Sequence, residues 1–319
     1  MRALVCHHLS DDRSGLRLES SWPEPPAPLA GEVTVAVHVA GLNYPDYLML
    51  SGGYQFRPEL PFVPGTEGCG TIIAAGPGAE TLLGARVMIG GRQGCFAERI
   101  TVSARQVRPV PGMLGDAEAA SFTAGALTAW VGLMVRGRLK AGERVLISGA
   151  GGGMGRVAVQ LARHEGAHVV AVASTPERLA LGIAAGAHDG VLIDRAAPEI
   201  ALRDIDLVFD PVGGPLAPVL LRTLRRGGRY AIIGFTAGRP APVPLNRLLL
   251  KEVELIGVRA GEQGRQDPAA GAQHIREIDA RADALRPHIG LSVALADAEI
   301  ALAAMGAGTL DGKAVVAIN

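Results

Sequence analysis

The sequence has few cysteines, few aromatic residues and no surplus of charge of either sign. Its three cysteines, Cys6, Cys69 and Cys95, are dispersed and odd in number, which argues against a disulfide framework and favours the reducing cytoplasm. Lysine plus arginine equals aspartate plus glutamate at 31 each, without a basic block, so neither nucleic acid nor an anionic membrane surface is an expected partner. The first residues lack the apolar core of a signal peptide, and no uncharged apolar run reaches the roughly 20 residues of a membrane span.

What the sequence does contain is enough apolar material for a sizeable core. Of its 319 residues, 48% are hydrophobic and 19% are charged, while only 4% are aromatic. The length exceeds that of a usual single domain, so two domains are expected. The 43 glycines carry little information by their number, and their positions matter more.

Two patterns of hydrophobicity follow one another along the chain. The first ~115 residues are typical of an antiparallel β region, with an alternating strand at 32–39 and dense turn signals. From about Ala117 buried strands alternate with amphipathic helices, which predicts a doubly wound parallel sheet. Strands are expected at 145–148, 168–173, 190–193, 206–209 and 229–234, and helices from Met154, at 176–185 and at 215–226.

The tail from about Gly261 contains a helical stretch at 269–285 and ends in a strand-like KAVVAI. We therefore expect it to rejoin the first domain. The predicted division is a first domain at 1–118, a dinucleotide-binding domain at 119–259 and a return to the first domain at 260–319.

A glycine-rich turn, GAGGGMG at 149–155, lies between the first strand of the βα region and its helix. It matches the dinucleotide fingerprint as Ala150, Gly152 and Gly155, with alanine at the first glycine position. Such a turn lets the backbone approach a pyrophosphate, and the helix that follows offers unpaired N–H groups to it. The sequence therefore predicts a dinucleotide site, to which Gly153 and Met154 also contribute.

The residue that ends the second strand predicts which dinucleotide is bound. An acidic side chain there would accept hydrogen bonds from the ribose of NAD and would repel a 2′-phosphate. This chain has Ser174 and Thr175 at that place, followed by Arg178, and Arg195 comes after the next strand. Hydroxyl and guanidinium groups suit a phosphate, so NADPH is favoured over NADH. Arg178 is equally well explained as a solvated helix residue.

With these motifs, the chain resembles the medium-chain dehydrogenase/reductase superfamily, and within it the zinc-independent quinone oxidoreductase (zeta-crystallin-like) family. The resemblance covers nearly the whole chain and implies an α/β fold, in which a GroES-like β-rich catalytic domain accompanies the Rossmann sheet. It departs from the family at Arg195, which is commonly tyrosine, and at 259–266, which lacks the usual aromatic residues. Its motifs are GLNYPDYLMLSGGY (41–54), PFVPGTEGCG (61–70), ASFTAGALTAW (120–130), GAGGGMG, DLVFDPVGG (206–214), GRYAIIGF (228–235) and DGKAVVAI (311–318).

The resemblance also implies that no metal is bound. Zinc-dependent members place a cysteine where this chain has Asn43, and a histidine where it has Thr66. Neither asparagine nor threonine competes with thiolate or imidazole for zinc. Without a Lewis acid, reduction of a conjugated acceptor is favoured over oxidation of an alcohol.

The family motifs further imply roles for single residues. Tyr54 matches the catalytic tyrosine of related enoyl reductases and is the expected proton donor, with packing as the alternative. Asn43 and Asp46 would line the same pocket, although Asp46 is equally well explained as an acceptor that holds the 41–54 loop. The expected nicotinamide and ribose contacts are Thr128, Asp210, Val212, Gly213, Gly234 and Phe235.

The function expected from the sequence is an NADPH-dependent, zinc-independent reductase of a small quinone or α,β-unsaturated carbonyl. An enoyl-thioester reductase is a second possibility, and a nucleotide-binding redox sensor or structural protein with little turnover is a third. Family analogy implies a homodimer joined through the edges of the Rossmann sheets.

Overall fold

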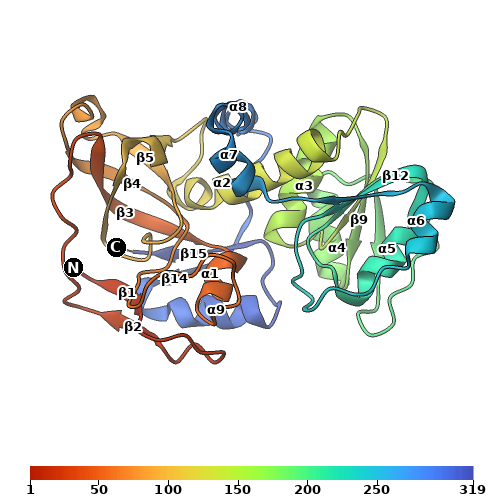
Figure 1. The fold of residues 1–319 in the computed structure, drawn as a ribbon, viewed down its shortest axis with the longest axis horizontal. Coiled ribbons are helices and arrows are strands. Elements are labelled where there is room, and N and C mark those ends of the chain that lie inside the picture. Colours follow the sequence, from red (N-terminus) through yellow and green to blue (C-terminus); the bar gives the residue numbers. More distant parts are fainter. Residues whose placement is uncertain (319) are drawn as a thin grey trace. The chain divides into compact units, whose positions relative to one another are not determined.

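The computed structural model describes residues 1–318 and divides the chain into two compact units (Figure 1). The first unit comprises Met1–Thr123 and the chain from Ile289 onward, and the second comprises Ala124–His288. The tail therefore returns to the first unit, as expected. It does so later than predicted, because residues 260–288 group with the second unit, and the first boundary lies within a helix rather than after residue 118.

The first unit is built on a seven-stranded sheet with the order β14-β15-β3-β4-β5-β7, and β6 also pairs with β3. The C-terminal strand β15 runs antiparallel to β3, with Val316 opposite Ala40, so the two ends of the chain share one sheet. Its strands are β3 (Glu32–Leu42), β4 (Glu67–Ala75), β5 (Arg86–Gly90), β6 (Arg99–Ser103), β7 (Val107–Pro109), β14 (Ile289–Ala294) and β15 (Lys313–Ala317).

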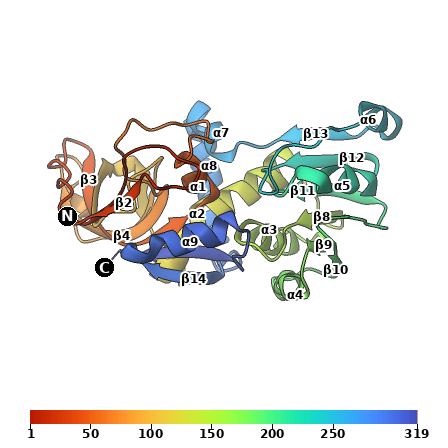
Figure 2. The same ribbon diagram turned by 90° about the horizontal axis from the view of Figure 1, so that it is seen from below.

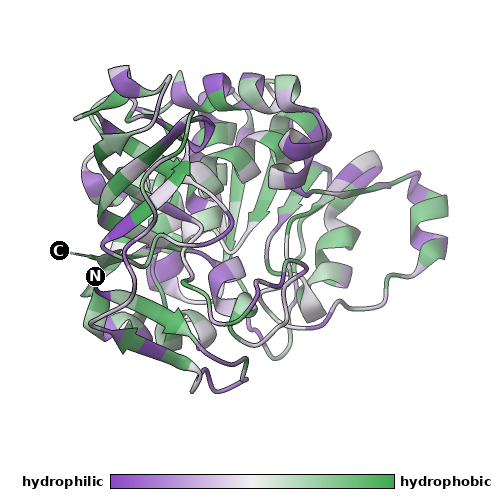
Figure 3. Cartoon of the chain, turned by 60° about the vertical axis from the view of Figure 1, so that its left-hand side comes forward, coloured by the Kyte–Doolittle hydropathy of each residue, from purple (hydrophilic) through white to green (hydrophobic). Residues whose placement is uncertain are grey.

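A two-stranded sheet and short helices complete this unit. The elements are β1 (Ala3–Cys6), β2 (Leu16–Glu19), α1 (Tyr44–Met49), α9 (Ala298–Gly306) and the 3-10 helices η1 (Glu80–Leu82), η2 (Ala104–Gln106) and η5 (Leu295–Asp297). The strands supply most of the buried apolar side chains, since alternate residues of each strand face inward. Figure 3 shows this concentration of hydrophobic residues along the strands.

The second unit is a six-stranded parallel sheet with the order β10-β9-β8-β11-β12-β13 (Figure 2). Its strands are β8 (Arg144–Ser148), β9 (His168–Ala173), β10 (Asp189–Leu192), β11 (Ile205–Asp210), β12 (Leu224–Ile232) and β13 (Glu254–Gly257). The order reverses between β8 and β11, so the connections from β8 to β9 and from β11 to β12 run in opposite directions. Because such crossovers are right-handed, their helices cover opposite faces of the sheet.

The helices of this unit are α3 (Gly153–His164), α4 (Pro176–Ala184), η4 (Gly214–Leu216), α5 (Ala217–Thr223), α6 (Leu245–Lys251), α7 (Ala260–Gln266) and α8 (Pro268–Asp279). The predicted strands at 145–148, 168–173, 190–193 and 206–209 agree with β8 to β11 within one residue at each end. The predicted helix at 215–226 is too long, because Leu224 already pairs with Ile205 as the first residue of β12. The predicted helix at 269–285 ends at Asp279 and continues as turns.

A long helix, α2 (Asp116–Trp130), continues as a π-helix, η3 (Val131–Arg136), and contains the boundary between the two units. Its length and composition alone would allow it to cross a membrane, which the sequence pattern did not suggest. However, 56% of its most apolar stretch is buried within the fold, as is typical of a core helix.

Candidate functional site

The glycine-rich turn after β8 has the close backbone contacts that its sequence predicts. Gly149 has a φ of +61°, and a Cβ on Gly155 would lie 2.2 Å from the Gly149 carbonyl oxygen. A Cβ on Gly151 would lie 2.6 Å from the Cβ of Arg178. At Gly152, by contrast, a Cβ would meet nothing closer than 3.4 Å. Three of the glycines are therefore required for the turn itself.

The same turn leads directly into α3, whose N-cap is Gly152. No side chain caps this end of the helix. The first N–H groups of a helix lack partners within it and carry partial positive charge, so they can bind a pyrophosphate. Ala150 is buried and its Cβ packs near Gly182, so the alanine in the fingerprint fits the turn. The predicted residues Gly152, Gly153, Met154 and Gly155 all lie in this turn or the first helical turn.

At the end of β9 the structure brings together two of the predicted phosphate contacts. The Nε of Arg195 donates a hydrogen bond of 2.9 Å to the Oγ of Ser174, and the arginine is exposed. Thr175 has another role, because its Oγ accepts from the backbone N–H of Arg178 at 3.3 Å and caps α4. The pair of Ser174 and Arg195 offers a hydroxyl and a guanidinium, a combination suited to a phosphate.

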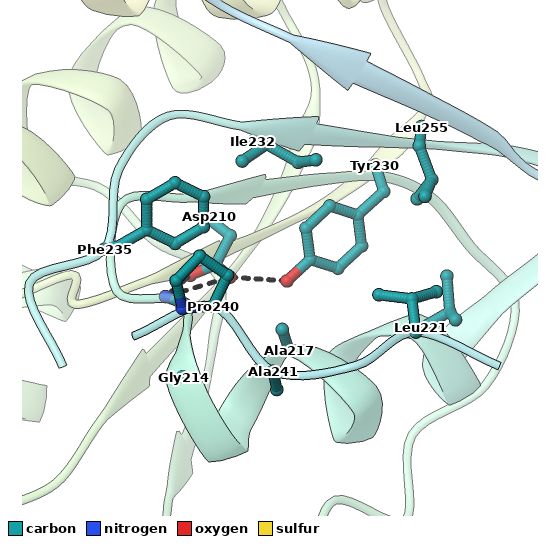
Figure 4. A pocket seen from close by; sticks show the side chains of 12 residues that line it. Asp210, Gly214, Ala217, Leu221, Tyr230, Ile232, Phe235, Pro240, Ala241 and Leu255 are labelled. Atoms are coloured by element: carbon teal, nitrogen blue, oxygen red, sulfur yellow. Dashed lines mark hydrogen bonds between the residues drawn. The ribbon is translucent and has the colours of Figure 1, made fainter. Parts of the chain in front are cut away.

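Asp210, at the end of β11, has its carboxylate directed into the protein. Ser148 Oγ and Tyr230 OH both donate hydrogen bonds to it, as do the backbone N–H groups of Val212 at 2.9 Å and Gly213 at 3.0 Å. Figure 4 shows the bond from Tyr230. The residue is only 1% exposed. Burial and the adjacent carboxylate raise the pKa of the Tyr230 phenol well above its usual range. Asp210 therefore fixes the loop that contains the other predicted coenzyme contacts, Val212 and Gly213, and uses their backbone N–H groups to do so.

The loop after β11 and the loop after β12 lie against each other. Gly213 has a φ of +65°, and a Cβ there would lie 2.8 Å from the ring of Phe235. The N–H of Gly234 donates to the Asp210 carbonyl at 3.3 Å. Phe235 is 42% exposed, and Thr128 is half-buried on α2. These contacts place Asp210, Gly213, Gly234 and Phe235 together at the carboxyl ends of β11 and β12.

A second polar cluster lies in the first unit, around the start of α1. Asn43 Nδ2 donates to Glu67 Oε1 at 2.8 Å and to Thr66 Oγ1 at 3.2 Å, while Lys313 Nζ donates to Asn43 Oδ1 at 2.5 Å. The Asn43 carboxamide is therefore fully occupied by its own chain. Lys313 also lies 3.2 Å from Glu67 Oε1 in a buried ion pair.

Asp46 belongs to the same cluster and is completely buried. Its Oδ2 accepts from the Asn43 backbone N–H at 2.8 Å and from Thr66 Oγ1 at 3.3 Å, whereas Oδ1 has no hydrogen-bond partner. Burial, together with the nearby Glu67 carboxylate, raises the pKa of Asp46 to about 7, although the backbone hydrogen bond and Lys313 oppose that rise. Asp46 can therefore exchange a proton near neutral pH.

Tyr54 follows α1 and is half-buried against the apolar core of the first unit. Among residues 1–318 its hydroxyl has no hydrogen-bond partner. This position is compatible with both interpretations from the sequence, a proton donor and a packing residue.

The side chains near Asn43 and Thr66 bear on the question of metal binding. Within the described part of the chain, no three His, Cys, Asp or Glu side chains are grouped so that they could hold a metal ion. Cys95, the nearest thiol, is fully buried, and burial raises its pKa far above the ordinary value, with Asp46 and Glu67 adding to the rise. The ammonium of Lys313 beside Asn43 would also repel a divalent cation.

Sequence reasoning missed four members of these clusters: Ser148, Glu67, Tyr230 and Lys313. Glu67 and Lys313 are in quoted motifs, GTEGCG and DGKAVVAI, yet 246 residues separate them in the chain. Only the pairing of β15 with β3 and of β3 with β4 brings them together. A buried-strand pattern that contains a charged residue was the signal available at Lys313.

Comparison with known proteins agrees with this geometry. A family model described as the alcohol dehydrogenase GroES-like domain matches residues 29–112, and one described as a zinc-binding dehydrogenase matches residues 153–276. Quinone oxidoreductase-like protein 2 of Bos taurus is 32% identical over 305 residues, which cover 91% of this chain and 84% of that protein. The chain belongs to the medium-chain dehydrogenase/reductase superfamily. Within it, the chain is a member of the quinone oxidoreductase-like family, with a GroES-like first unit and a Rossmann second unit.

Two solved structures extend the comparison over the whole chain. The quinone oxidoreductase of Thermus thermophilus, described with its NADPH complex, is 34% identical, covers 100% of both chains and has a TM-score of 0.86. A mycobacterial protein solved in complex with NADPH is 28% identical, also covers 100% of both chains and has a TM-score of 0.89.

Proposed function

We propose that this chain is an NADPH-dependent reductase of quinones or α,β-unsaturated carbonyls that works without zinc. The observation that carries the proposal is the pair of Ser174 and Arg195 at the end of β9, where an NAD site has an acidic side chain. The uncapped start of α3 supplies the pyrophosphate site beside it. Two relatives solved as NADPH complexes support this choice of coenzyme.

The residues of the second unit fit a dinucleotide. Gly152 leaves the backbone open at the turn, and Gly213 holds its loop in a conformation that other residues rarely adopt. Bound NADPH would supply a hydride to the acceptor, and the reduced acceptor would then need a proton at carbon or oxygen. The protein has to hold the coenzyme, stabilise the developing negative charge and provide that proton.

Tyr54 is the proposed proton donor, because its hydroxyl is not occupied by another described residue. Asn43 and Asp46 are proposed to position the segment that contains Tyr54. Asn43 is the N-cap of α1, and the hydrogen bond from its backbone to Asp46 fixes the first turn of that helix. These contacts hold the start of the segment that leads to Tyr54.

Zinc independence is proposed from the same cluster. The amide of Asn43 already binds Thr66, Glu67 and Lys313, and the Lys313 ammonium at its oxygen disfavours a cation there. Metal analysis of the purified protein should find less than stoichiometric zinc, and a chelator should leave turnover unchanged. Stoichiometric zinc whose removal abolishes turnover would contradict the proposal.

The direct test is NADPH oxidation with a panel of quinones, enones and enoyl-CoA thioesters. Turnover with quinones or enones supports the proposal, whereas tight NADPH binding without any turnover would favour a redox sensor or structural protein. Tyr54→Phe should slow turnover about 100-fold or more while NADPH binding persists, since it removes one general acid. Tyr44→Phe, the same change on α1, is the matched control. An unchanged rate in Tyr54→Phe would leave Tyr54 as a packing residue.

An enoyl-thioester reductase is the second candidate. The chain is 33% identical over 313 residues to part of the mycocerosic acid synthase-like polyketide synthase of Mycobacterium tuberculosis. These residues are 92% of this chain and 14% of that protein. Preferential turnover of enoyl-CoA in the same panel would select this candidate.

We also propose that two copies of the chain associate through β13 and α6. β13 is the last strand of its sheet, so its outer edge offers backbone groups for pairing. Leu245, Leu249 and Leu250 on α6 are 74%, 78% and 76% exposed. Leu249→Asp with Leu250→Asp should convert a dimer to a monomer in light scattering, whereas Leu192→Asp on the opposite edge strand should not. A wild-type monomer, or a dimer in the double variant, would contradict the proposal.

A further inference from the structure

A small apolar pocket lies beside the buried Asp210–Tyr230 pair in the second unit (Figure 4). Its volume is about 150 Å³, and its walls come from α5, β12, β13, the end of β11 and the loops after β11 and β12. The apolar lining includes Leu221, Ile232 and Leu255, with Pro240 and Val243 from the loop. A cavity of this size and lining stays dry and accepts benzene in another protein.

The Asp210 carboxylate and the Tyr230 hydroxyl proton already have hydrogen-bond partners within the protein. Tyr230 OH donates to Asp210, whose carboxylate also accepts from Ser148 and two backbone N–H groups. A ligand in the pocket therefore finds aromatic and aliphatic carbon but no free donor on this pair, and the acceptor that remains is the Tyr230 hydroxyl oxygen. Burying an unpaired hydroxyl or carbonyl there would be unfavourable, so the pocket selects against polar ligands.

Aromatic carbon lines two sides of the space. The ring of Tyr230 lies on one side and Phe235 at another, and Phe235 is 42% exposed. Aromatic rings attract one another in offset and edge-to-face geometry. A bound ring would also cover part of the exposed Phe235 side chain. Covering Phe235 favours any apolar ligand, and the ring geometry favours an aromatic ligand over an aliphatic one of the same size.

The pocket overlaps the proposed coenzyme site only in part, through Asp210, Gly213 and Phe235. None of its lining residues comes from the glycine-rich turn 149–155 or from the segment 174–195. Its helix, α5, lies in the crossover from β11 to β12 and so covers the face opposite α3. The two sites share only the loops that contain Asp210, Gly213 and Phe235.

We propose that this pocket is a second ligand site, which takes one aromatic hydrocarbon ring and remains accessible when the coenzyme is bound. The ligand class is a benzene or alkylbenzene ring without a buried polar group. The ring should bind to the protein without coenzyme as well, so its binding does not depend on whether the chain reduces quinones.

The first test is titration of the unliganded protein with toluene, followed by ligand-observed NMR and calorimetry. One toluene should bind saturably per chain. Ala217→Leu, which places a larger side chain on the α5 wall, should weaken binding at least tenfold. Ala184→Leu, the same change at an exposed position of α4, should leave it unaltered. No saturable binding, or equal binding to both variants, would overturn the proposal.

The second test uses phenol to probe the saturated Asp210–Tyr230 pair. In the wild type, phenol should bind no more tightly than toluene. Tyr230→Phe removes the donor from Asp210 and frees an acceptor for the ligand, so phenol should gain at least tenfold over toluene. If phenol binds the wild type more tightly than toluene, the pocket does not have the chemistry proposed. Circular dichroism of the variant verifies its fold, and Ala217→Leu keeps the proposal testable if Tyr230→Phe does not fold.

The third test is to repeat the toluene titration with saturating NADPH. Simultaneous binding supports a separate site. An apparent dissociation constant for toluene that rises in proportion to the NADPH concentration would show that the pocket is part of the coenzyme site, and would overturn the proposal. A protein that binds toluene but not NADPH would contradict the proposed function and leave this inference intact.

Discussion

Each domain of this protein buries one aspartate beside its proposed site, and the two are satisfied to very different extents. In the Rossmann domain, Asp210 accepts hydrogen bonds from two hydroxyls and two backbone N–H groups. In the GroES-like domain, one oxygen of Asp46 accepts two hydrogen bonds and the other accepts none. The first carboxylate fixes a loop, whereas the second is poorly stabilised as an anion and titrates near neutral pH.

Asp210 and Asp46 illustrate two roles that a buried carboxyl group can have. A carboxylate surrounded by donors can hold a backbone in place without any cation. A carboxylate that is incompletely paired, and that has another carboxylate nearby, tends to take up a proton. Asp46 has Glu67 as that neighbour, with Lys313 partly compensating. We therefore expect removal of Asp210 to affect mainly stability, and replacement of Asp46 to affect mainly pH dependence.

The largest expected effect is that of Asp210→Ala. It leaves the hydroxyls of Ser148 and Tyr230 and two backbone N–H groups without their acceptor. We expect the free energy of unfolding to fall by about 3–5 kcal/mol, measured by urea denaturation. Glu199→Ala, at an exposed position, should change it by no more than about 0.5 kcal/mol. Equal stability of the two variants would remove the distinction between the two aspartates.

Ser174→Asp should have the next largest effect, on the coenzyme rather than on stability. The new carboxylate would repel the 2′-phosphate and displace the Arg195 guanidinium from its present partner. We expect NADPH affinity to fall about 100-fold, or ~2.7 kcal/mol, in fluorescence titration, with NADH then preferred. Asp46→Asn, in the other domain, should leave both affinities within about twofold. An unchanged NADPH affinity in Ser174→Asp would show that the phosphate binds elsewhere.

The smallest effect is expected from Asp46→Asn, in the pH dependence of stability. The pKa of Asp46 is raised from 3.8 to about 7 in the folded chain. Between these values the folded chain holds a proton that the unfolded chain has released, so its stability falls as pH rises through this window. The wild type should lose about 2 kcal/mol of unfolding free energy from this group between about pH 5 and 8. The variant should not, and identical pH profiles would contradict the assignment.

Much of the Rossmann domain was predictable because its determinants are local. A buried strand, a glycine-rich turn and an amphipathic helix follow one another within about 20 residues, and each has its own pattern. The positions of Gly152, Gly155 and Ser174 follow from that order, whereas Asp210 was expected from the family resemblance. The direction of the Asp210 side chain did not follow, since it depends on Tyr230 in a different strand.

The GroES-like domain was predictable as a β-rich unit but not as a site. Its polar cluster combines residues of α1, β4 and β15, which only the sheet register brings within hydrogen-bond distance. That residues 260–288 belong to the Rossmann unit was likewise not predictable from the sequence. The local patterns of α7 and α8 do not indicate which unit these helices pack against.

By itself the sequence determined the order of the elements, the glycines of the coenzyme turn and the hydroxyl that ends the second strand, since each depends on neighbours a few residues away. Only the tertiary structure decided that Lys313 meets Glu67 and that Tyr230 meets Asp210. A buried charge or hydroxyl needs a hydrogen-bond partner. The fold decides which residue lies beside it, and that residue is seldom close in the chain.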